Sequence, residues 1–153
     1  MKKIFLVILI LLLNNCGYTP IYSAKDSNFK IISLNSNVNN NLTNYIENSI
    51  SVFSNEDSNK KLNIVFNLKE NVSVILKDSK GDPSKNRLTI TVDLSLFDIN
   101  KNLLASNTFS ESFQYNIDDN KYNLKQYEKN IKFSLVEQIS SQIIEYLTNV
   151  KWF

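Results

Sequence analysis

The chain has 153 residues, of which 42% are hydrophobic and 21% charged, which is enough apolar material for one compact domain and too little for two. It has no histidine, one cysteine and two glycines. This composition excludes an internal disulfide, a thiolate metal cluster and a glycine-rich phosphate loop, and it removes the commonest general base. Two of the 17 basic residues, Lys2 and Lys3, lie in the first 15 residues, and the remaining 15 balance the 15 acidic ones. A net charge near zero argues against nucleic acid as a partner.

The N-terminal segment has the layout of a secretory signal. The positive residues 1–3 precede an unbroken apolar run, 4–13, which is followed by Asn14, Asn15 and Cys16. As a helix the apolar run would span about 15 Å, half the hydrocarbon core of a bilayer, so it is too short for a stable transmembrane anchor. A cysteine directly after such a run resembles a lipobox, in which the thiol is acylated before the signal is cleaved.

We therefore expect residues 1–15 to form a lipoprotein signal peptide and Cys16 to be the lipid anchor. Cys16 would carry a covalent diacylglycerol and an N-acyl chain such as palmitate, and no other cofactor is expected. The Asn pair before Cys16 departs from the small residues usual at those positions, and an incidental thiol in an ordinary signal is the alternative interpretation. Residues 16–28, with turn formers and polar side chains, are expected to be a tether, and residues 29–153 a single domain.

The domain is expected to begin with a strand and a helix. Residues 29–34 form a short run with β-branched side chains, typical of a strand. Apolar residues then recur at helical spacing from Leu42 to Phe53, and Asn40 or Asn41 can cap the start of this helix.

Three strands are expected next. Apolar residues occupy the even positions of 62–68 and, after a break at Glu70 and Asn71, continue on the same face at Val72, Val74 and Leu76. The alternation recurs in residues 88–96, and residues 104–115 carry Phe109, Phe113 and Tyr115 on one side. Period-two alternation predicts an antiparallel sheet with one covered face and one solvated face.

The last predicted element is a helix of about 28 residues, on the order of 40 Å long. Asp118 and Asp119 suit a position at its start, where they would cap the helix, and this interpretation is favoured over a pair of acid/base carboxylates. Glu128 and Lys132 are one turn apart and are expected to pair. The apolar side chains that repeat along it, and that we expect to be core, are Leu124, Tyr127, Ile131, Leu135, Ile139, Ile143 and Leu147.

These elements predict an α+β fold in which two helices pack on one face of a four-stranded, mostly antiparallel sheet, in the order β-α-β-β-β-α. In this order the chain resembles the LPS-assembly lipoproteins, the LptE-like family, in their alphaproteobacterial form. The resemblance is carried by three segments: Cys16-Gly17-Tyr18-Thr19-Pro20-Ile21-Tyr22; Gly81-Asp82-Pro83-Ser84 with the strand that follows; and Ser112-Phe113-Gln114-Tyr115-Asn116 before a long helix.

The resemblance implies a function. Members of the family sit as a plug inside the large outer-membrane barrel LptD, help it to fold and help lipopolysaccharide to reach the cell surface. It implies a non-enzymatic protein anchored through Cys16 to the outer membrane, on the periplasmic side and inside the barrel lumen, with LptD as partner and lipopolysaccharide as a second candidate. Gly17 stands where an Asp would resemble an inner-membrane retention signal.

The segment from residue 77 to 87 is a candidate contact site. It is predicted to be a loop and carries Lys77, Lys80, Lys85 and Arg87, which could bind the phosphates of lipid A or line the barrel lumen. The simpler interpretation is a solvated hairpin kept soluble by its lysines.

The C-terminal pair, Trp152 and Phe153, has two interpretations. The aromatic rings either pack back on the sheet or anchor the protein at a membrane interface or a partner. Packing on the sheet or fraying is the simpler expectation.

Two other function classes remain open on the sequence. An envelope lipoprotein accessory to another lipid or solute transporter, or to general barrel assembly, could share a small α+β plan, since fold does not fix function. A carboxylate hydrolase is the third class, and the lack of histidine makes it the least favoured.

Overall fold

The computed structural model describes residues 27–149, so Cys16, Trp152 and Phe153 lie outside the described residues. The elements are β1 (Lys30–Ser36), α2 (Asn41–Ser51), β2 (Lys61–Lys77), β3 (Pro83–Phe97), β4 (Leu103–Asn116) and α3 (Lys121–Asn149). This order confirms the predicted α+β fold. Neither α2 nor α3 combines the length and the apolar character needed to cross a membrane.

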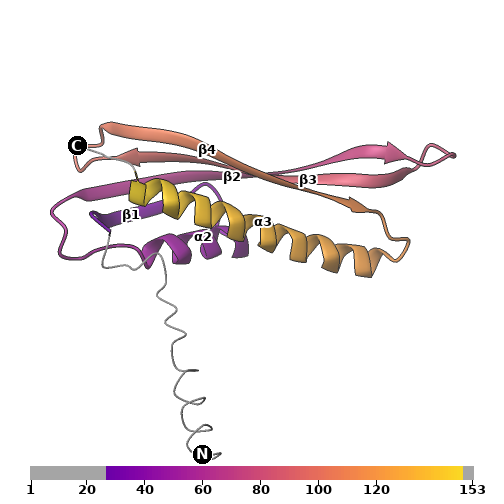
Figure 1. Ribbon diagram of the computed structural model, residues 1–153, viewed down its shortest axis with the longest axis horizontal. Helices are drawn as coiled ribbons and strands as arrows, with labels where there is room; N and C mark the ends of the chain where they lie inside the picture. The colour runs from indigo at the N-terminus through magenta and orange to yellow at the C-terminus, as the bar shows by residue number, and fades with distance from the viewer. Residues whose placement is uncertain (1–26, 150–153) are drawn as a thin grey trace, which may run out of the picture.

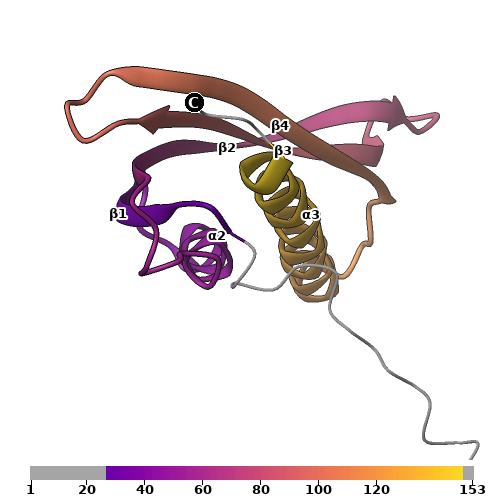
Figure 2. The same cartoon turned by 60° about the vertical axis from the view of Figure 1, so that its left-hand side comes forward.

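The four strands form one mixed sheet in the order β1-β2-β3-β4. β1 and β2 run parallel, because α2 carries the chain back to the end at which β1 started, and the two other pairs are antiparallel. Both helices lie on the same face of the sheet (Figure 2). The sheet is therefore mostly antiparallel, as expected, with one parallel edge.

The core lies between this face and the helices, and its members from β2 and β3 are the even-numbered residues that the alternation predicted. Burial of each such side chain stabilises the fold by roughly 1.5–3 kcal/mol relative to its exposure. Ring contacts join α3 to β4, with centroids 5.6 Å apart for Phe109 and Tyr146 and 6.2 Å apart for Tyr115 and Tyr127. The core residues from β2 and β3 are Leu62, Ile64, Phe66, Leu68, Leu88, Ile90, Val92, Leu94 and Leu96.

Asn40 caps α2. Its side-chain oxygen accepts from the backbone N–H of Leu42 at 2.9 Å and of Thr43 at 3.0 Å, and the Thr43 hydroxyl accepts from the N–H of Asn40. This reciprocal capping box satisfies backbone groups that have no partner inside the helix. Of the two predicted caps, Asn40 is thus the correct one, and Phe53 lies just beyond the end of the helix.

The start of α3 corrects a prediction. Asn120, and not Asp118 or Asp119, is the cap: its side-chain oxygen accepts from the backbone N–H of Tyr122 at 3.0 Å and of Asn123 at 3.2 Å. Asp118 instead accepts from the N–H of Asn120, which shapes the turn before the helix. The two aspartates are too early in the chain to reach the first N–H groups of a helix that starts at Lys121.

The predicted pair of Glu128 and Lys132 is also wrong, because each finds a partner across the molecule. Glu128 accepts a hydrogen bond from the hydroxyl of Tyr115 on β4, and Lys132 forms an ion pair with the carboxylate of Glu70 on β2. Burial, reinforced by the neighbouring Glu128, raises the pKa of Tyr115. Both contacts fasten α3 to the sheet, which an exposed pair within the helix would not do.

β2 runs without a break through Glu70 and Asn71, so the predicted interruption is wrong. Past Leu68, however, the helix-facing side chains of β2 are only partly covered: that of Val72 is 50% exposed and that of Val74 is 47% exposed.

Two aromatic residues lie at this less covered end, and one of them, Tyr127, was expected in the core. Phe113 on β4 is 44% exposed and Tyr127 on α3 is 47% exposed, whereas Ile131 and the later apolar residues predicted for the core of α3 are buried. The alternation of apolar residues in the sequence therefore extends further than the core itself.

Candidate functional site

The two ends of the sheet differ in what they carry. At the end where β2 begins, Asn55 donates from its side chain to the carbonyl of the buried Ser27, and Ser58 donates to the carbonyl of Asn28. The described chain therefore enters the fold at this end, hereafter the entry end. The hairpin of β2 and β3 forms the opposite end, hereafter the tip (Figure 1). The 17 residues of β2 separate the two ends by about 55 Å.

The tip is a tight turn built on Asp78. Its side-chain oxygen accepts from the backbone N–H groups of Lys80 and Asp82, both at 2.9 Å, and its own N–H donates to the carbonyl of Asp82 at 2.8 Å. Gly81 has φ +89°, in the left-handed region that glycine adopts without steric cost. No atom would meet a Cβ at Gly81, so backbone conformation alone favours glycine there.

The four basic residues predicted as contacts all lie at this end. Lys77 ends β2 and Lys80 is in the turn, whereas Lys85 and Arg87 lie within β3 and not in a loop, because β3 begins at Pro83. Lys85 and Arg87 are two residues apart and so point to the same face of the sheet, the one opposite to the even-numbered core residues. None of the four forms an ion pair in the described part of the chain, which leaves their charges available.

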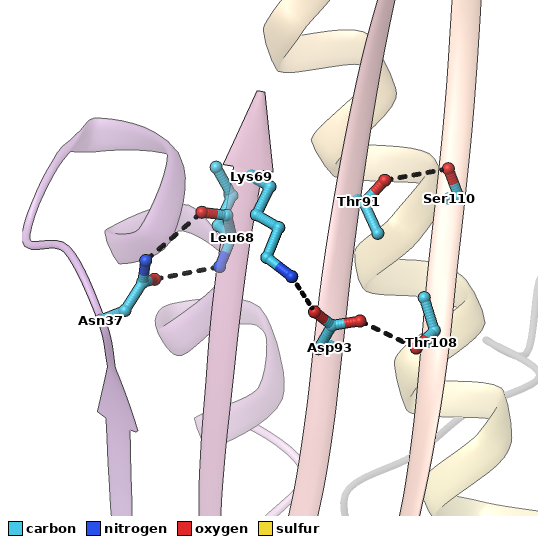
Figure 3. Close-up of polar contacts among 7 residues, drawn as sticks. All are labelled: Asn37, Leu68, Lys69, Thr91, Asp93, Thr108 and Ser110. Carbon is cyan, nitrogen blue, oxygen red and sulfur yellow. Dashed lines mark hydrogen bonds and ion pairs between the residues drawn. The ribbon is translucent and has the colours of Figure 1, made fainter. Parts of the chain in front are cut away.

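The middle of this solvated sheet face is different, because its polar groups bind one another (Figure 3). Lys69 donates to Asp93 at 2.7 Å, the Thr108 hydroxyl donates to the other oxygen of Asp93 at 2.8 Å, and the hydroxyls of Thr91 and Ser110 lie 3.1 Å apart. The hydrogen bond from Lys69, followed by that from Thr108, lowers the pKa of Asp93. The central face is thus self-paired, and unpaired positive charge gathers at the tip.

Asn37 is a polar residue that the sequence did not single out. Its side-chain oxygen accepts from the N–H of Leu68 at 2.9 Å and its amide nitrogen donates to the Leu68 carbonyl at 3.4 Å (Figure 3). The amide side chain therefore takes the place of one more backbone residue beside β2 and ends the parallel ladder. One Asn among many in this sequence gave no signal for this role.

The comparisons with known proteins concern the fold. No protein-family model and no curated protein matches the chain. Solved structures do match: a lipoprotein B from Nitrosomonas europaea (15% identity, TM-score 0.62), covering 87% of this chain and 94% of that one, and the rare lipoprotein B from Shewanella oneidensis (13%, 0.55), covering 78% and 97%. A lipoprotein from Caulobacter crescentus also matches (13%, 0.55), covering 82% of this chain and 91% of that one.

The described chain thus has the fold of small bacterial lipoproteins. In particular, it has the fold of lipoprotein B. The resemblance to the LPS-assembly lipoproteins that the sequence predicted is thereby confirmed for the fold. At these identities the likeness concerns the fold alone.

Proposed function

We propose that this protein is an outer-membrane lipoprotein that acts as plug, chaperone and subunit of a lipopolysaccharide-export barrel of the LptD type. The observation that carries the proposal is the β-α-β-β-β-α fold shared with lipoprotein B over most of both chains. It is supported by Cys16, which directly follows a signal-like segment. The protein would act by binding and not as an enzyme, with acyl chains on Cys16 as its membrane anchor.

The separation of the two ends supports this arrangement. If Cys16 is held at the periplasmic leaflet, the nearest described part of the chain is the entry end, where Asn55 binds the carbonyl of Ser27. The tip, about 55 Å away along β2, would then reach across a bilayer that is about 40–45 Å thick with its headgroups. A plug of this length that stands upright inside a barrel has its tip at the level of the outer leaflet.

The charge distribution supports a role for the tip at that level. The segment 77–87 carries only two carboxylates against its four basic residues, and that of Asp78 is already engaged by backbone N–H groups. Charge-assisted hydrogen bonds from such side chains are suited to the phosphates of lipid A. On this proposal the basic tip contacts either the transported glycolipid or the lumen wall of the barrel.

The proposal is tested by purifying the tagged full chain from native membranes in mild detergent and identifying its partner. A near-stoichiometric outer-membrane barrel of the lipopolysaccharide-transport type supports the proposal. An inner-membrane transporter, a general barrel-assembly complex or the absence of a large partner contradicts it, and the first two outcomes would favour an accessory of another transporter or of barrel assembly.

A photo-crosslinking experiment tests the insertion of the tip. A crosslinker at Lys80 or Ser84 is expected to capture a strand of the barrel. Lys101 is the matched control, since it lies in a similar turn at the entry end, where Asp98 accepts from the N–H groups of Asn100 and Asn102. Capture at Lys101 and not at Lys80 would contradict the proposed orientation.

A further inference from the structure

The edge of the sheet formed by β2 is only half covered. β1 pairs with β2 as far as Ser36 and Phe66, and the side chain of Asn37 extends the pairing to Leu68. Beyond this point the described chain places no strand beside β2, so the stretch 69–74 is an open edge up to the irregularity that follows Val74. Open edges of this kind are templates for another strand.

The backbone groups of this edge point outward. Leu68 directs both its N–H and its carbonyl to Asn37, on the side away from β3. Alternate residues of a strand direct these groups to the same side, so Glu70, Val72 and Val74 present theirs to the open edge. The odd-numbered residues between them face β3, with which β2 is paired throughout this stretch.

An open cleft of about 690 Å³ adjoins the edge at Glu70. Its walls are the start of α2, with Leu42, and the first half of α3, with Tyr122 and Phe133. The cleft would receive side chains of an added strand on the helix-facing side of the sheet, which is also the side of the half-exposed Val72.

The cleft has an excess of positive charge. Its two carboxylates are engaged, since Glu70 pairs with Lys132 and Glu128 accepts from the hydroxyl of Tyr115. Lys125 and Lys129, which also line it, form no ion pair within residues 27–149. A ligand that carries a carboxylate at this position would complement them.

We infer that the open β2 edge, residues 69–74, and the adjoining cleft form a binding site for an extended strand of another polypeptide. The strand forms main-chain hydrogen bonds with the even-numbered edge residues, and its alternate side chains are apolar beside the valines and acidic beside Lys125 and Lys129. A second copy of this chain fits less well, because its own edge offers only Glu70, which Lys132 already holds. This inference does not depend on the identity of the barrel partner.

The test measures amide hydrogen exchange of the full chain in mild detergent with three short peptides. Every second residue of each peptide is serine, and the residues between, which share one face of a strand, are valines and one Glu, Thr or Lys. The Glu peptide is expected to slow exchange at Glu70, Val72 and Val74 by about tenfold or more, as in a formed ladder, with Asn71 and Ser73 unchanged. Affinity falls in the order Glu, Thr, Lys. Protection of these amides by none of the peptides overturns the inference, as does protection that rises with protein concentration alone.

Two pairs of variants test separately how the open edge and the cleft contribute to peptide binding. Val72→Pro removes an outward N–H and is expected to weaken binding of the Glu peptide by about tenfold. Its control is Ser112→Pro on β4, the opposite edge strand. The N–H of Thr108 donates to the side chain of Asn107 and not to β3, and Ser112, also even-numbered, directs its N–H to the same outer side.

Reversal of a cleft charge tests the acidic contact. Lys129→Glu is expected to reverse the preference between the Glu and Lys peptides, whereas Lys121→Glu, outside the cleft, preserves it. Unaltered binding of the Glu peptide by both Val72→Pro and Lys129→Glu contradicts the inference.

Discussion

The two halves of the β2 strand share a sequence pattern and differ in their surroundings. In the first half, residues 61–68, the strand has neighbours on both edges and helices over its apolar face. In the second half, residues 69–77, it has a neighbour only in β3, and its apolar side chains are half exposed. The first half supplies stability. The second half, with the basic tip and the open edge, holds the surfaces available to partners.

The largest effect is expected when the same side chain is truncated at the two ends of the sheet. Phe66→Ala removes a ring that is 1% exposed and is expected to lower the free energy of unfolding by about 3–5 kcal/mol, as cavities in cores do. Phe113→Ala removes a ring that is 44% exposed, and the expected loss is about 1 kcal/mol or less. Urea denaturation of both variants measures the two losses, and equal losses would show that the end of the sheet around Phe113 is covered in solution.

The boundary between the halves can be moved by changing Asn37. Asn37→Ala removes both hydrogen bonds to Leu68 and is expected to cost about 1–2 kcal/mol in the free energy of unfolding. The amide of Leu68 then exchanges faster, at a rate close to that of Glu70. Asn39→Ala, at an exposed position, is the control. An unchanged Leu68 amide would contradict the role given to Asn37.

Turns at the two ends of the sheet can be compared by opposite substitutions. Gly81→Ala forces a side chain into a backbone with φ +89° and is expected to destabilise the tip by about 1 kcal/mol. Lys101→Gly relieves a similar conformation, φ +66°, at the entry end and is expected to stabilise by about 0.5–1 kcal/mol. The Gly81 change should appear in the exchange of the tip amides more than in global unfolding, because that half can open locally. If Gly81→Ala lowered the free energy of global unfolding as much as the free energy of local opening at the tip, the tip would not open independently.

The smallest effect concerns the polar face between the two ends. The pKa of Asp93 is lowered from 3.8, so the ionised form stabilises the fold; this contribution is complete above pH 3.8 and is lost as the pH falls through the lower folded pKa. Because the pair with Lys69 is exposed to solvent, its contribution is about 0.5 kcal/mol or less. Asp93→Asn is therefore expected to reduce stability at neutral pH by this amount and to flatten the acid limb of the stability curve. Asp57→Asn, at an exposed carboxylate without an ion pair among the described residues, is the control and is expected to leave the stability at neutral pH unchanged.

Much of the fold was predictable from local pattern. The even-numbered apolar residues of β2 and β3 indicated which face is buried, and the helical spacing indicated α2 and α3, because these periods follow from backbone geometry. The tip was predictable as a basic turn, since Gly81 and its neighbours are turn formers. The break at Glu70 was wrong because this charged residue keeps the alternation of the strand and is held by Lys132 from α3, a partner that no local pattern reveals.

By itself the sequence determined the order of the elements, which alternate residues of the strands face the core, and the approximate place of the free positive charge. Only the tertiary structure decided where the core stops. Val72 and Val74 continue the apolar pattern of the buried Leu68, but β1 ends at Ser36 and the buried part of α3 begins only at Ile131, so both valines remain half exposed. Alternation records which face of a strand an apolar side chain occupies, whereas its burial depends on what another part of the chain places over that face.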